Sequence, residues 1–132
     1  MRAILFEDEP IKKRDVSREL TTMGFKVEAF DNLRDGVSAI QSDPEGVSIA
    51  VSDMYYPLEP GKDESESGTR LLEILKEIGI GIPVVIVSSA ALKVPEALAC
   101  VHYSLDSYWE DALRRAVKNA VAFEERDTKE QG

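Results

Sequence analysis

The 132 residues, 43% of them hydrophobic, are enough for one domain with a buried core. The net charge of −9 argues against direct binding to nucleic acid or to an anionic membrane, and it favours basic partners and divalent cations. The single cysteine excludes an intrachain disulfide and favours a reducing, cytoplasmic compartment, and no apolar run is long enough to span a bilayer.

The N-terminal stretch predicts a strand followed by a helix. Residues 3–6 form a short apolar run, which is typical of a buried strand. Pro10 follows three acidic residues, a pattern that favours the first turn of a helix, and Gly24 marks the end of this helix near Met23. The apolar face of the predicted helix consists of Ile11, Val16, Leu20 and Met23.

A second strand, a second helix and a third strand are predicted next. Residues 26–30 alternate polar and apolar side chains, which predicts a strand at or near the edge of a sheet. Asp31 or Asn32 can cap the following helix, which ends close to the next proline. Residues 47–52 are rich in β-branched side chains, as in a buried strand of a parallel sheet, and they end at Asp53.

An acidic loop separates the third strand from the third helix. Residues 58–67 contain four acidic residues and one lysine, which gives this loop a net charge of −3. A helix is predicted over about residues 68–78, and a buried strand follows at residues 84–87. Ser88 and Ser89 stand at the end of that strand.

The last part of the chain predicts a short helix, a fifth strand and a longer helix. The short helix falls within residues 90–98, where an interior proline limits its length. A strand is predicted at residues 99–103, and the final helix covers about residues 108–123. The domain therefore spans residues 1–123, and the charged residues 124–132 are predicted to form a frayed tail.

Alternating strands and helices predict an α/β fold. The expected architecture is a flavodoxin-like, doubly wound, five-stranded parallel sheet with strand order 2-1-3-4-5 and helices on both faces. In this order the first, third and fourth strands are neighbours, and ligands bind at the carboxyl ends of such strands. Four residues at these ends are expected to meet in one crevice: Glu7, Asp8, Asp53 and Ser88.

The chemistry of this crevice follows from its negative charge. Two like charges about 4 Å apart repel by roughly 4 kcal/mol at an effective dielectric constant of 20. Either one carboxylate takes up a proton, or a cation lies among them. Partly solvated oxygen ligands suit Mg²⁺, and a carboxylate beside this ion can attack a phosphoryl donor and become an aspartyl phosphate.

The motifs at the strand ends together resemble the receiver domain of bacterial two-component response regulators. The resemblance covers roughly residues 2–123, and it depends on the combination and order of the motifs rather than on any one of them. These motifs are Glu7-Asp8-Glu9-Pro10, Asp53 with Pro57, Gly68 at the start of a helix, and Val87-Ser88-Ser89.

The resemblance implies a role for each residue of the crevice. Asp53 would accept a phosphoryl group from a histidine kinase or a phosphotransfer protein. Asp8 would bind Mg²⁺ together with Glu7, Asp53 and the backbone carbonyl of Tyr55. Ser88 would take the place of the family's switch hydroxyl. In a gapless reading of the last strand, Tyr103 falls on the family's switch aromatic.

Two departures from the family pattern stand out. The family usually has a lysine followed by proline after the fifth strand, and in a gapless reading Asp106 and Ser107 fall on these positions here. The loss removes a cation that would pair with the phosphoryl group, and Asp106 would add repulsion if it faced inward. Gly68 also follows Asp53 by 15 residues, more than the family usually has, so residues 58–67 are an insertion beside the crevice.

The same residues also have purely structural interpretations. The acidic residues before Pro10 could cap the first helix, and Ser88 could cap the segment after its strand. Tyr103 could be ordinary core packing. Tyr108 and Trp109 are expected to pack at the start of the last helix.

The leading hypothesis is a single-domain receiver that is phosphorylated on Asp53. It would be no enzyme beyond Mg²⁺-dependent self-phosphorylation and dephosphorylation, and its output would pass to an unknown protein by contact or by phosphorelay. The alternative is a pseudo-receiver, an interaction module that is not phosphorylated, which the missing lysine supports. Both depend on how Asp8 and Asp53 meet, and a basic side chain that closed their cleft would contradict the signalling hypothesis.

Two other classes are disfavoured. A flavodoxin-like electron carrier needs a loop after the first strand that binds a flavin phosphate, and the acidic residues there would repel it. A hydrolase with an aspartate nucleophile is disfavoured because the residue two positions after Asp53 is Tyr55 and not a second acid.

Overall fold

A computed structural model describes the backbone of residues 1–131 and the side chains of residues 1–121. The strands of the main sheet are β1 Arg2–Phe6, β2 Lys26–Phe30, β3 Val47–Ser52, β6 Val84–Ser88 and β7 Ala99–His102. The helices are α1 Pro10–Thr22, α2 Leu33–Ser42, α3 Ser67–Ile78 and α4 Trp109–Gln131, and a short 3-10 turn covers Pro44–Gly46. All neighbouring strands of the main sheet are parallel.

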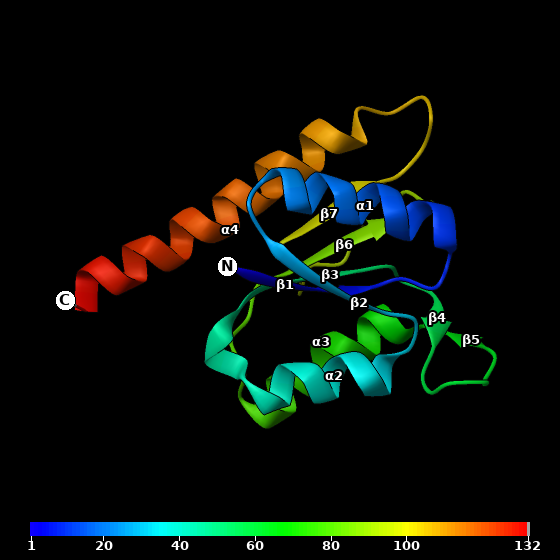
Figure 1. The fold of residues 1–132 in the computed structure, drawn as a ribbon, viewed down its shortest axis with the longest axis horizontal. Helices are drawn as coiled ribbons and strands as arrows, with labels where there is room; N and C mark the ends of the chain where they lie inside the picture. Colours follow the sequence, from blue (N-terminus) through cyan, green and yellow to red (C-terminus); the bar gives the residue numbers. More distant parts are fainter. Residues whose placement is uncertain (132) are drawn as a thin grey trace.

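The predicted fold class is confirmed. The strand order is β2-β1-β3-β6-β7, which is the expected 2-1-3-4-5 order for the five strands of the main sheet. Helices α1 and α4 cover one face of the sheet, and α2 and α3 cover the other (Figure 1). Strand β2 lies at the edge, as the alternating pattern of residues 26–30 predicts.

Two apolar layers form because the side chains of a strand alternate between the faces of the sheet. In β1, Ala3 and Leu5 pack with apolar residues of α1 and α4. Ile4 and Phe6 point the other way and pack with α2 and α3. A central strand that is buried on both faces is held firmly, so the residues that follow its carboxyl end have a rigid support.

The first helix buries a face that begins one residue later than predicted. The side chain of Glu9 caps the helix by accepting hydrogen bonds from the backbone N–H groups of Ile11 (3.0 Å) and Lys12 (2.6 Å). Lys12, Val16 and Leu20 are buried at i, i+4, i+8 spacing, whereas Ile11 is 58% exposed. The prediction that Ile11 begins the apolar face was wrong, and a lysine occupies the first buried position.

The predicted short helix within residues 90–98 is absent, and this part of the chain consists of bends and turns. Pro95 has no N–H to donate, and it disfavours a helical conformation for Val94 before it. The N–H of Ala97 instead donates to the carbonyl of Val94 at 3.1 Å, which closes a turn. Leu92 packs against the apolar layer under α2 and α3, so the segment covers the sheet without forming a helix.

The acidic insertion at residues 58–67, predicted as a loop, contributes one strand to a small antiparallel hairpin. Strand β4 Tyr56–Pro57 pairs with β5 Glu64–Ser65. The Ser67 hydroxyl donates a hydrogen bond to the carbonyl of Tyr56, which anchors the hairpin to the start of α3. The hairpin lies at the end of the molecule where the sheet strands finish (Figure 1).

The last helix is longer than predicted. The backbone of α4 continues past Phe123 to Gln131, so residues 124–131 of the expected frayed tail are helical, and Gly132 lies outside the described residues. Trp109 is buried, as expected, but Tyr108 is exposed and does not pack. Within residues 1–131, no helix combines the length and the apolar character that crossing a membrane requires.

Candidate functional site

The acidic residues after β1 and the aspartate after β3 come together at one edge of the sheet. Phe6 of β1 lies opposite Ser52 of β3, and the N–H of Asp53 donates to the Phe6 carbonyl at 2.9 Å. One carboxylate oxygen from each of Glu7, Asp8 and Asp53 lies within 4.8 Å of the others. The convergence expected from strand order is therefore present in the structure.

These carboxylates line a cavity of about 340 Å³ at the carboxyl ends of the strands. Every residue that the sequence singled out for this site is part of its wall. They are Glu7, Asp8, Asp53, Tyr55, Ser88 and Tyr103. Lys12 and Glu64 also line the cavity, and neither was predicted to be there.

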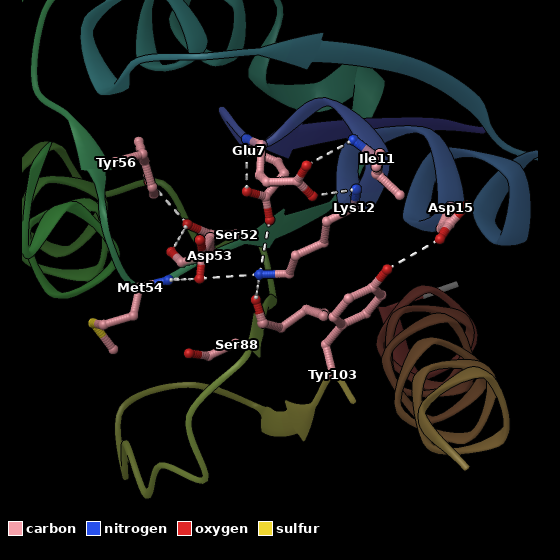
Figure 2. A network of polar contacts seen from close by, with 12 residues as sticks. Glu7, Ile11, Lys12, Asp15, Ser52, Asp53, Met54, Tyr56, Ser88 and Tyr103 are labelled. Carbon is pink, nitrogen blue, oxygen red and sulfur yellow. Dashed lines mark hydrogen bonds and ion pairs between the residues drawn. The ribbon is translucent and has the colours of Figure 1, made fainter. Parts of the chain in front are cut away.

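Lys12 places a buried cation between the strand ends (Figure 2). Its Nζ lies 2.8 Å from Glu7 Oε1 and 3.1 Å from Asp53 Oδ1, and it donates a hydrogen bond to the Val87 carbonyl at 2.8 Å. The side chains of Lys12 and Glu7 are only 3% and 2% exposed. The ammonium thus contacts three oxygen atoms: it forms ion pairs with one residue after β1 and one after β3, and a hydrogen bond with a carbonyl of β6.

The periodicity of the first helix indicates that Lys12 is buried. Lys12 precedes Val16 and Leu20 by four and eight residues, so a helix that buries these two also buries the lysine. An apolar face that starts at Ile11 does not include Lys12, so the predicted face missed the i, i+4, i+8 spacing of Lys12 with Val16 and Leu20. A lysine on the buried face of a helix, next to an acidic strand end, predicts an internal ion pair.

Lys12 does not close the acidic cleft. It pairs with only one oxygen of Asp53, Oδ1, which also accepts a hydrogen bond from the Met54 N–H at 2.7 Å. Among the backbone groups of residues 1–131 and the side chains of residues 1–121, none donates a hydrogen bond to Asp53 Oδ2, and no basic side chain of residues 1–121 lies within ion-pair distance of Asp8. The basic side chain therefore occupies one side of the cleft, and Asp8 and the second Asp53 oxygen remain available.

Glu7 is the most restricted of the predicted metal ligands. Its Oε1 atom contacts Lys12, and its Oε2 atom accepts a hydrogen bond from the Glu9 N–H at 3.2 Å. Burial raises the pKa of Glu7 to about 7, and the nearby Asp53 charge acts in the same direction, while the hydrogen bond and charge of Lys12 oppose them. Asp8 and Asp53 are consequently better placed than Glu7 to bind a cation directly.

The donor set fits Mg²⁺. Asp8 and Asp53 supply hard carboxylate oxygens that are partly exposed, and the cavity has room for the waters that this ion retains. Glu64, delivered by the β4–β5 hairpin, adds another carboxylate to the cavity wall. A hydrogen bond with Asp8 and the negative charge of Asp8 raise the pKa of Glu64.

Ser88 and Tyr103 combine features of their structural and functional interpretations. Ser88 is buried, and its Oγ accepts a hydrogen bond from the Ala90 N–H at 3.2 Å, as a capping residue would. The Tyr103 hydroxyl donates to Asp15 Oδ2 at 3.0 Å, and its ring centroid lies 4.9 Å from that of Trp109. Both residues also line the cavity, so packing and contact with a ligand are compatible.

Asp106 and Gly68 are the residues at the two departures from the family pattern. Asp106 is exposed and does not line the cavity, so it adds no charge to the crevice wall. A Cβ atom at Gly68 would lie 2.7 Å from the Asp53 carbonyl oxygen and 3.0 Å from Met54 Cα. Helix α3 therefore begins against the backbone that carries Asp53, despite the insertion before it.

No protein-family model matches the chain, and no curated protein does. Solved structures do match. A response regulator receiver domain protein from Clostridium thermocellum is 18% identical, with a TM-score of 0.72, and the match covers 94% of this chain and 96% of that one. The response regulator TrrA from Thermotoga maritima, solved in complex with Mg(2+)-BeF, is 17% identical with a TM-score of 0.72, over 90% of this chain and 97% of that one.

The response regulator StyR is 25% identical to this chain, with a TM-score of 0.69. The match covers 98% of this chain and 64% of StyR. The protein thus has the fold of response regulator receiver domains over nearly its whole length.

Proposed function

We propose that this protein is a receiver of two-component signalling in which Asp53 accepts a phosphoryl group from a histidine kinase or a phosphotransfer protein, in the cytoplasm. The observation that carries the proposal is the meeting of Asp8 and Asp53 at an open cavity, at the strand ends of a receiver fold. The resemblance to TrrA, which was solved with Mg(2+)-BeF, supports the same site.

The residues of the cavity have separate roles in phosphoryl transfer. Asp8, Asp53 and the backbone carbonyl of Tyr55 would hold Mg²⁺, which when bound neutralises charge on the phosphoryl oxygens and orients the donor. The carboxylate of Asp53 attacks phosphorus, and the bond from phosphorus to the donor breaks with its electron pair going to the donor. The Ser88 hydroxyl, buried at the next strand end, donates to an oxygen of the new phosphoryl group.

Tyr55 has a separate proposed role. The residue lines the cavity and is 46% exposed, so it is in contact with both the cavity and bulk solvent. We expect it to slow hydrolysis of the phosphoryl group by limiting the approach of water. An unchanged dephosphorylation rate in Tyr55→Gly would rule this role out.

Acetyl phosphate tests the proposed function without knowledge of the kinase. The protein is incubated with acetyl phosphate and Mg²⁺, and its intact mass is measured. We expect a mass gain of one phosphoryl group that is absent from Asp53→Asn and from samples with a chelator. A wild-type protein that gains no mass, or a gain that survives in Asp53→Asn, would reject Asp53 as the phosphoacceptor.

One observation favours the pseudo-receiver as a second candidate. Lys12 already neutralises part of the acidic cluster, so the cluster has a stable arrangement without a bound ion or phosphoryl group. In that case the protein would act only through contact with partner proteins. Folded protein that binds no Mg²⁺ and gains no mass with acetyl phosphate would support this alternative.

A further inference from the structure

Lys12 contacts only one of the two carboxylate oxygens of Asp53. Its Nζ contacts Oδ1 at 3.1 Å, and the N–H of Met54 donates to the same atom at 2.7 Å. Neither the backbone of residues 1–131 nor a side chain of residues 1–121 donates a hydrogen bond to Oδ2. The carboxylate is therefore held through one oxygen, while the other keeps its lone pairs free.

The position of Lys12 is itself fixed from three directions. Its ammonium contacts Glu7 Oε1 at 2.8 Å and the Val87 carbonyl at 2.8 Å, as well as Asp53, and the side chain is 3% exposed (Figure 2). The Tyr103 ring centroid lies 5.6 Å from Nζ. A charge buried among fixed acceptors cannot reorient freely, so the oxygen that it holds is also fixed.

We infer that Lys12 is a positioning residue for phosphoryl transfer, which contacts Oδ1 of Asp53 and so fixes the orientation of the carboxylate that attacks phosphorus. This inference rests on the proposed function. One carboxylate oxygen of Asp53 forms the new bond to phosphorus, and the bond from phosphorus to the acetate oxygen of acetyl phosphate breaks with its electron pair leaving on acetate. The reactants and products carry the same total charge, and no proton is transferred.

The charge of Lys12 also has a consequence at this step. Before transfer, Asp53 carries one negative charge, and afterwards the aspartyl phosphate carries about two. The added charge appears beside Glu7 and Asp8, where it is repelled. A fixed ammonium within contact distance of Asp53 offsets this repulsion as it develops, which is the general form of electrostatic stabilisation in transfer reactions.

A purely structural role for Lys12, as the partner of buried Glu7, must be separated from positioning. The double variant Glu7→Gln/Lys12→Met removes both charges of that pair together, so no buried charge is left alone and the fold is expected to persist. It also leaves the net charge of the cluster unchanged. At saturating Mg²⁺, which removes any contribution of Glu7 to metal affinity, we therefore expect a rate of phosphorylation by acetyl phosphate at least about tenfold lower than that of wild type.

A matched control is available one residue away. Lys13 carries the same charge, and its side chain lies outside the cavity wall. Lys13→Met is expected to match wild type in Mg²⁺ affinity and in phosphorylation rate. If the double variant does not fold, Lys12→Arg replaces it, because arginine keeps the charge but displaces the donor atoms relative to Oδ1.

The outcomes separate the two proposals. A lowered rate at saturating Mg²⁺, in the double variant or in Lys12→Arg, supports the positioning role. A folded variant that is phosphorylated at the wild-type rate overturns it and leaves the proposed function intact. Wild-type protein that gains no mass at saturating Mg²⁺ and acetyl phosphate overturns the proposed function, and the positioning role with it.

Discussion

The two sides of the acidic cavity differ in what balances their charge. On the inner side, Glu7 is buried and contacts Lys12 and a backbone N–H. On the outer side, Asp8 faces Glu64 of the hairpin, a second carboxylate. The inner side is complete without a ligand, whereas the outer side combines like charges that a cation would relieve. The comparison teaches that Lys12 fixes the arrangement of the side chains on the inner side. The uncompensated negative charge of the outer side then determines that the site binds a cation.

Removal of the Lys12 charge from the inner side is expected to have the largest effect on the free energy of unfolding. Lys12→Met leaves the Glu7 carboxylate buried without its partner, so the free energy of unfolding should fall by about 3–5 kcal/mol. Urea denaturation followed by circular dichroism measures this change. Lys13→Met should stay within about 0.5 kcal/mol of wild type. Equal stability of both variants would show that the buried pair does not hold the inner side together.

Gly68→Ala tests the support beneath Asp53. A Cβ at this position would lie 2.7 Å from the Asp53 carbonyl oxygen, which is backbone and can move only with β3. We expect a loss of about 1–3 kcal/mol in the free energy of unfolding and a lower rate of phosphorylation. Gly81→Ala is the control, since a Cβ there would meet no atom within 4 Å. Indistinguishable unfolding midpoints for the two variants would refute the steric account.

Tyr103→Phe separates the hydroxyl of this residue from its ring. The substitution removes the hydrogen bond to Asp15 and keeps the ring contact with Trp109. We expect a loss of about 1 kcal/mol in the free energy of unfolding, because one partly buried hydrogen bond is lost. Thermal denaturation gives the stability, and the intact-mass assay gives the phosphorylation rate. A stability equal to wild type would mean that only the ring contributes.

Glu64→Gln probes the outer side, where the smallest effect on stability is expected. Glu64 is exposed, so the fold should be unaffected, but a negative charge beside Asp8 is removed. We expect Mg²⁺ affinity to fall several-fold, because the ion loses the attraction of that charge. Asp63→Asn makes the same charge change in the preceding residue. Asp63 lies outside the cavity wall, so this variant should leave the affinity at its wild-type value. A similar loss in both variants would indicate only a general charge effect.

The sheet and the meeting of its acidic strand ends could be predicted from sequence. Apolar runs ended at Glu7, at Asp53 and at Ser88, and the strand order then placed these ends side by side. This inference needed only the topology of parallel sheets, which is strongly constrained. The same topology also predicts which side chains at these strand ends face the cavity.

The features that were missed depend on packing between elements. Lys12 was overlooked because the phase of α1 was set from Ile11, and only contact with the sheet shows which face is buried. Residues 90–98 were expected to form a helix, but Pro95 and contacts with the core favoured turns. The β4–β5 pairing is two residues long on each side, too short to leave a periodic pattern.

A Mg²⁺ titration of wild type and Asp8→Asn by calorimetry tests the central claim most directly. Asp8 lines the outer side of the cavity, and no basic side chain of residues 1–121 pairs with it, so the substitution should leave the fold intact. We expect wild type to bind Mg²⁺, and we expect Asp8→Asn to lose this binding while its unfolding midpoint stays the same or rises, because a repelling charge is removed. Absence of binding to wild type, or equal binding to the variant, would contradict the central claim.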